Sequence, residues 1–133
     1  MDAPDALLQT LASEAMDLAT AVSRVRALVA EGAVRTPNGR FLAAAVLVRS
    51  QDVATVAEAH EFALMAMQGH RPARALAARS FDKLRVLRGE IQKFGTQRAS
   101  DGGELPCDPA TTDSERAKWD LPTLATLRRG GSV

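Results

Sequence analysis

The chain has 133 residues, the size of one domain, so we treat residues 1–133 as a single unit. With 46% hydrophobic and 25% charged residues it has the composition of a globular protein, and its single cysteine excludes a fold held by internal disulfides. The formal net charge of +1 gives no bias toward nucleic acid, and 25 alanines without any tyrosine favour helices over sheets.

The first predicted helix runs from about Pro4 to Glu31. Its apolar positions are spaced as in a narrow coiled-coil seam. The seam consists of Leu11, Ala15, Leu18, Val22, Val25 and Val29. A seam of this length packs either on the rest of the domain or on a second copy of itself, so a homodimer through the first helix is one prediction.

Three shorter helices are predicted to follow, over about residues 41–49, 53–68 and 72–88. A turn at residues 36–39 precedes them, because its Pro and Asn-Gly favour turn geometry. The 41–49 helix is apolar almost all round and should be buried, and Asp52 caps the next one. The predicted fold is all-α, with two helical hairpins in a four-helix array. The second hairpin has the look of a Sel1 or tetratricopeptide unit.

The character of the chain changes after Gly89, so we divide it into a helical body, residues 1–89, and an irregular tail, residues 90–133. The tail should wrap around the helices. Residues 94–98 and 104–107 can pair as a short β-hairpin, and Thr112 begins a capping box that opens a short helix.

His60 is the titratable group that most suggests chemistry, because it lies within the apolar stripe of the 53–68 helix. A buried imidazole needs partners for both nitrogens. It is either a core residue that donates to a carbonyl, or a general acid or base oriented by a carboxylate. Asp82 is the candidate carboxylate, since two antiparallel helices can bring mid-helix residues together.

The start of the tail is rich in amides, with Gln92, Lys93, Thr96 and Gln97 within six residues. Amides both donate and accept, which suits recognition of a small polar molecule. The alternative is that these groups satisfy helix ends and anchor the tail. The two histidines and one cysteine have no zinc-ligand spacing, so we expect no metal and no other cofactor.

The chain also resembles a bacterial family of unknown function. The resemblance rests on Ala59-His60, Asp82-Lys83, the run from Gln92 to Gln97, Pro106-Cys107-Asp108-Pro109 and Asp120-Leu121-Pro122, within about residues 41–127. Members share a Pro-Gln-aromatic-Gly-Thr-Gln signature and a Leu-Pro-rich tail. Ile91 stands where the family usually has Pro, and Lys83 where Arg is common. The resemblance implies that His60, Asp82, Gln92, Thr96 and Gln97 form a site.

Two functions therefore compete. The first is a small cofactor-independent enzyme or ligand-binding domain, in which His60 and Asp82 form an acid–base pair for hydrolysis, cyclisation or isomerisation. Gln92, Thr96 and Gln97 then hold the polar substrate, and Lys93 or Arg79 neutralises an anion. The alternative is a helical protein-interaction module without catalytic activity.

Other partners are not expected. Nucleic acid is an unlikely ligand, because no aromatic residues interleave the arginines of residues 71–88. No apolar run reaches the roughly 20 residues that span a bilayer, so we expect no membrane partner. The lone Cys107 and the acidic N-terminus predict a cytoplasmic protein.

Overall fold

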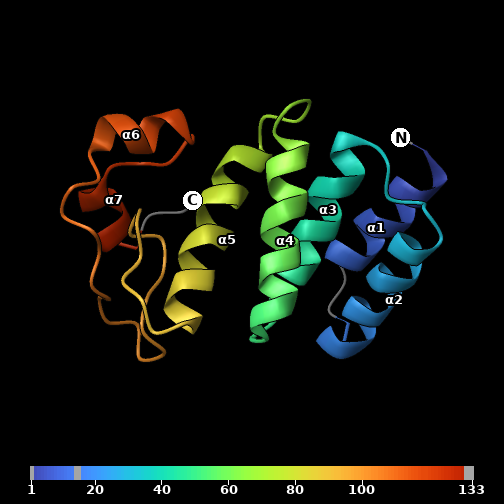
Figure 1. The fold of residues 1–133 in the computed structure, drawn as a ribbon, viewed down its shortest axis with the longest axis horizontal. Coiled ribbons are helices and arrows are strands. Elements are labelled where there is room, and N and C mark those ends of the chain that lie inside the picture. The colour runs from blue at the N-terminus through green and yellow to red at the C-terminus, as the bar shows by residue number, and fades with distance from the viewer. Residues whose placement is uncertain (1, 14–15, 131–133) are drawn as a thin grey trace.

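A computed structural model describes residues 2–13 and 16–130, and within these ranges the fold is all-α as predicted. The described part of the chain has seven helices: α1 (Ala3–Ser13), α2 (Leu18–Ala30), α3 (Pro37–Leu47), α4 (Val53–Ala66), α5 (Ala73–Leu87), α6 (Asp113–Lys118) and α7 (Leu124–Arg128). Figure 1 shows them in a row, with α1 and α2 at one end, α3, α4 and α5 in the middle and the tail at the other end.

The single long helix predicted for residues 4–31 is wrong, because α1 ends at Ser13 and α2 begins only at Leu18. Asp17 caps α2 by accepting hydrogen bonds from the N–H (3.2 Å) and the hydroxyl (3.1 Å) of Thr20. Both helices pack on α3, so the seam is divided between two elements. Its member Ala15 lies outside the described residues.

The middle helix α3 is buried on most sides, as its apolar sequence predicts. It starts earlier than expected, since the predicted turn at residues 36–39 forms its cap and first turn. The Thr36 hydroxyl accepts from the N–H of Gly39 at 2.8 Å. Helix α4 packs against both α3 and α5. Asp52 caps α4 as predicted. The likeness of α4 and α5 to a Sel1 or tetratricopeptide unit stays a prediction.

The tail packs on α5 through a small core of its own, formed by Ala78, Phe94 and Leu121. The predicted β-hairpin is reduced to isolated pairings in the described residues: Arg98 pairs antiparallel with Glu104, and Gln92 pairs parallel with Cys107. Regular strands do not form because the N–H groups of residues 93, 94 and 96 donate to a side chain of α5. One half of the predicted capping box forms, with Thr112 accepting from the N–H of Glu115, while the Glu115 carboxylate pairs with Lys93.

Candidate functional site

Asp82 is completely buried on α5, and its carboxylate holds the loop that follows this helix. Oδ1 accepts hydrogen bonds from the N–H groups of Lys93 (2.8 Å) and Phe94 (3.0 Å). Oδ2 accepts from the N–H (3.0 Å) and the hydroxyl (2.8 Å) of Thr96. These four hydrogen-bond donors replace the water that burial removes, and they offset the free-energy cost of burying the carboxylate. The loop is therefore built around Asp82.

His60 is oriented by α5 through contacts other than the carboxylate of Asp82. Its Nδ1 lies 3.0 Å from the carbonyl oxygen of Ala77 and 2.9 Å from the hydroxyl of Ser80. A carbonyl oxygen only accepts, so Nδ1 carries the proton and Nε2 keeps its lone pair. Among the described contacts the predicted acid–base pair of His60 and Asp82 does not form a hydrogen bond.

Burial lowers the pKa of His60 below its ordinary value. The hydrogen bond to Ala77 and the negative charge of Glu61 act in the opposite direction and offset only part of this effect. The imidazole is therefore neutral at neutral pH. Its Nε2 is available as a hydrogen-bond acceptor for a ligand.

The amide side chains expected to hold a substrate instead bind backbone groups and the hydroxyl of Thr96. Gln92 is buried, and its Oε1 accepts from the N–H of Gln97 at 2.8 Å. Its Nε2 donates to the carbonyl oxygens of Gln97 (3.1 Å) and Leu105 (3.4 Å). Gln97 in turn donates to the carbonyl of Arg79 (3.4 Å) and the hydroxyl of Thr96 (3.1 Å). These contacts match the alternative interpretation, in which the amides anchor the tail.

Arg79, the other predicted anion contact, is half-buried on α5. Its Nε is buried and has no hydrogen-bond partner among the described residues. Burial lowers the pKa of this guanidinium, because the charged form loses solvation. Arg79 does not line the cavity described below. Its guanidinium is therefore not a contact of that cavity, although its carbonyl accepts from Gln97.

Arg116 on α6 is a buried charge that no pattern in the sequence singled out, and it is only 2% exposed. Its Nε donates to the carbonyl of Phe94 at 2.7 Å, and Nη1 donates to the carbonyl of Thr111 at 3.1 Å. Nη1 also pairs with Asp113 at 3.1 Å, and Nη2 lies 3.6 Å from the sulfur of Cys107. Arg116 thus connects three parts of the tail.

A cavity of about 190 Å³ lies between α4, α5 and the tail. Its apolar wall is formed by Leu64, Ala77, Ala78, Phe81, Phe94 and Trp119, and its polar side chains are His60 and Lys93. The rings make a continuous row. The centroid distances are 5.6 Å from His60 to Phe81, 6.3 Å from Phe81 to Phe94 and 5.8 Å from Phe94 to Trp119.

Lys93 supplies positive charge to this cavity. Its Nζ lies 5.5 Å from the ring centroid of Phe94 and forms an ion pair of 2.9 Å with Glu115. The side chains of both partners are more than one-third exposed, at 39% for Lys93 and 36% for Glu115. Of the four tail residues predicted to bind substrate, Lys93 is the one that lines the cavity.

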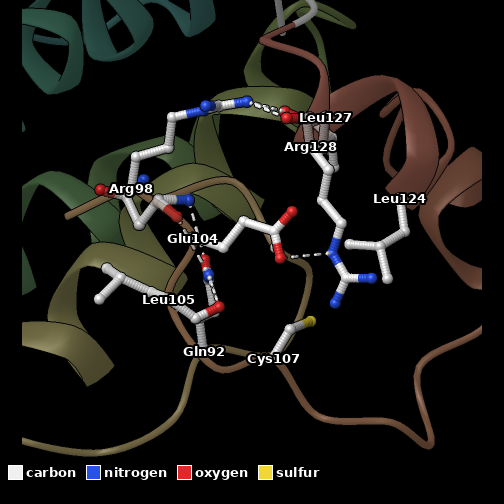
Figure 2. Close-up of a pocket in the computed structure, with 10 residues that line it drawn as sticks. Gln92, Arg98, Glu104, Leu105, Cys107, Leu124, Leu127 and Arg128 are labelled. Carbon is white, nitrogen blue, oxygen red and sulfur yellow. Dashed lines mark hydrogen bonds and ion pairs between the residues drawn. The ribbon is translucent and has the colours of Figure 1, made fainter. Parts of the chain in front are cut away.

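A second hollow, of about 10 Å³, lies inside the tail and has room for about one water. Figure 2 shows Arg98 beside it, reaching the carbonyls of Leu127 (2.7 Å) and Arg128 (2.6 Å). Arg128 in turn pairs with Glu104 at 3.7 Å. These contacts attach α7 to the rest of the tail. Cys107 also lines this hollow, and burial raises the pKa of its thiol, which disfavours the reactive thiolate.

Most of the seam that was predicted to form a dimer contact packs within the chain itself. Leu11 and Val25 of the seam are buried in the main core. A groove of about 320 Å³ runs between α1 and α2, and Leu7 at its edge is 54% exposed. Both the homodimer and the interaction module stay predictions.

Within residues 2–13 and 16–130, no helix is long and apolar enough to cross a membrane. Over the same ranges, no three side chains of His, Cys, Asp or Glu are grouped so that they would hold a metal ion.

The chain was also compared with known proteins. The predicted kinship with a bacterial family of unknown function stays a hypothesis, because the comparisons do not support it. No protein-family model, no curated protein and no solved structure matches this chain.

Proposed function

We propose that the protein is a binding domain for a small organic molecule, which lies in the cavity between α4, α5 and the tail. The observation that carries this proposal is an apolar cavity with two polar side chains, His60 and Lys93. Ligand sites commonly have this character, with an apolar wall and a few polar groups that fix orientation.

The size of the cavity limits the ligand. A dry cavity of about 150 Å³ holds benzene, whereas pockets for drug-sized molecules begin at about 300 Å³. The cavity here measures about 190 Å³. The cavity is half open to solvent, so one substituted ring or a short branched chain fits inside it and a larger ligand would extend from the opening.

Binding is a better-supported proposal than catalysis. General acid–base catalysis usually needs a second group that orients or complements the histidine. The carboxylate of Asp82 is fully engaged by backbone and hydroxyl donors. The neutral His60 offers an acceptor at Nε2, which is sufficient for ligand recognition. An enzymatic use of the same cavity stays a prediction.

Trp119 makes the proposal directly testable. It is the only tryptophan, the chain has no tyrosine, and its side chain lines the cavity. All tryptophan emission therefore comes from a residue of the cavity wall. We expect saturable changes when neutral and anionic single-ring compounds and short branched-chain acids are titrated. The absence of any saturable change across such a panel would overturn the proposal.

A matched pair of variants on α4 locates the binding. Leu64 lines the cavity, and the next residue, Met65, does not. Both are partly exposed, at 38% and 46%, so both tolerate a polar replacement. Leu64→Asp should weaken binding about tenfold by removing apolar contact, and Met65→Asp should leave it unchanged. Equal effects of the two variants would place the ligand elsewhere.

A further inference from the structure

Resting on the proposed function, we infer that the ligand is a single-ring carboxylate. Its ring lies against the row of aromatic side chains, and its carboxylate contacts the ammonium group of Lys93. The charge, the lining and the size of the cavity all support this ligand class.

The polar side of the cavity offers an anion a partner in Lys93, which the anion must share with Glu115. Lys93 is the charged side chain among the residues that line it, since His60 is neutral at neutral pH. An ammonium group has three donors, and the ion pair with Glu115 uses one of them. The other two donors can bind a carboxylate that shares the ammonium group with Glu115.

The lining selects for a flat, apolar body. Phe81, Phe94 and Trp119 present rings at centroid spacings of 5.8–6.3 Å, within the range of favourable aromatic pairs. A planar ring among them continues the same type of packing. The cavity is half open to solvent, and we place the carboxylate at its open side, near the partly exposed Lys93.

Benzoate and its neutral isostere benzamide test the inference, with Trp119 emission as the readout. The wild type should bind benzoate about tenfold more tightly than benzamide, and added salt should weaken only the benzoate complex. Lys93→Gln should abolish the difference by weakening benzoate alone, and Lys93→Arg should keep it. Lys118→Gln, an exposed lysine of α6 outside the cavity, is the control and should bind like the wild type.

Glu115 provides a second, opposite test. It competes with the ligand for the ammonium group, so Glu115→Gln should strengthen benzoate binding severalfold without changing benzamide binding. Tighter benzamide binding than benzoate binding, or equal binding of the two, would overturn the anion inference and leave the binding function in place. If neither probe binds, and no other compound of the panel does, the proposed function fails together with the inference. Thermal melts of each variant show whether a loss of binding is a loss of fold.

Discussion

Asp82 and Arg116 hold opposite sides of the backbone of Phe94. The carboxylate of Asp82 accepts from the N–H of Phe94 at 3.0 Å, and the guanidinium of Arg116 donates to its carbonyl at 2.7 Å. The two buried charges come from different helices, α5 and α6. The ring of Phe94 is 3% exposed and forms part of the cavity wall. The position of this wall therefore depends on both charges.

Asp82→Asn should destabilise the protein by about 3 kcal/mol. An asparagine places an NH₂ donor against backbone N–H donors that the carboxylate now satisfies, and it removes the charge that strengthens these bonds. Urea unfolding followed by circular dichroism measures the change. Glu31→Gln, an exposed acid at the end of α2, is the control and should change stability by less than about 0.5 kcal/mol. An Asp82→Asn variant as stable as the wild type would show that the loop is held by other contacts.

Arg116→Lys should loosen the tail while leaving the helical body folded. A lysine keeps the charge, but its compact ammonium group cannot reach the carbonyls of Phe94 and Thr111 in the two directions that the guanidinium spans. We expect a loss of about 2 kcal/mol, faster proteolysis within residues 95–130 and a red shift of Trp119 emission. Arg88→Lys, at the exposed end of α5, should show none of these effects. Unchanged proteolysis would contradict a role of Arg116 in attaching the tail.

The helices of the body could be predicted largely from the sequence, because apolar periodicity and end signals agreed there. Asp52 caps α4, and α3 is buried as its composition indicates. The break between α1 and α2 was missed because Leu11 and Val25 are spaced by whole heptads and are buried in the same core. Because the apolar periodicity continues across the break, it predicted one helix where the structure has two. Asp17, the cap of α2, was the local signal that could have revealed the break.

Of the predicted site residues, His60 and Lys93 line the candidate cavity. Asp82, Thr96 and Gln97 instead meet in a hydrogen-bonded network that holds the loop after α5. The sequence does not specify whether such donors and acceptors satisfy each other or a ligand, because this depends on the path of the loop. Lys93 and Trp119 reach the cavity from positions that periodicity does not connect with His60.

Gly39→Ala should destabilise the protein although alanine favours helices. A Cβ at this position of α3 would lie 2.5 Å from Oδ1 of Asp5 and 3.0 Å from the hydroxyl of Thr36. Asp5 cannot move aside easily, because its Oδ2 accepts from Thr36 (2.6 Å) and Asn38 (3.2 Å). We expect a loss of about 1–3 kcal/mol, as for other overpacked sites, measured by urea unfolding.

The same substitution in an Asp5→Ala background tests the cause. With the carboxylate removed, the remaining tight contact is the Thr36 hydroxyl at 3.0 Å, so the cost of Gly39→Ala should fall below about 1 kcal/mol. If the double variant loses as much stability as the sum of the single ones, the clash with Asp5 is not the reason.

His60 should make stability depend on pH in the weakly acidic range. Burial lowers the pKa of its folded-state imidazole below the ordinary value of 6.5, so the unfolded chain binds a proton at a higher pH than the folded one. Stability is therefore complete above about pH 6.5 and decreases as the pH falls through the lowered folded-state pKa. Asp52, whose pKa is also lowered, acts in a separate window below its ordinary value of 3.8.

The measurement is a series of urea unfolding curves between about pH 5 and pH 7. His60→Gln should flatten the decrease in this range, because the titrating group is gone. Glu61→Gln should extend the decrease to lower pH, since the charge of Glu61 raises the pKa of His60 in the folded state. A wild type whose stability rises on acidification from pH 7 would contradict the sign, and it would mean that the folded state binds the proton more tightly than the unfolded chain does.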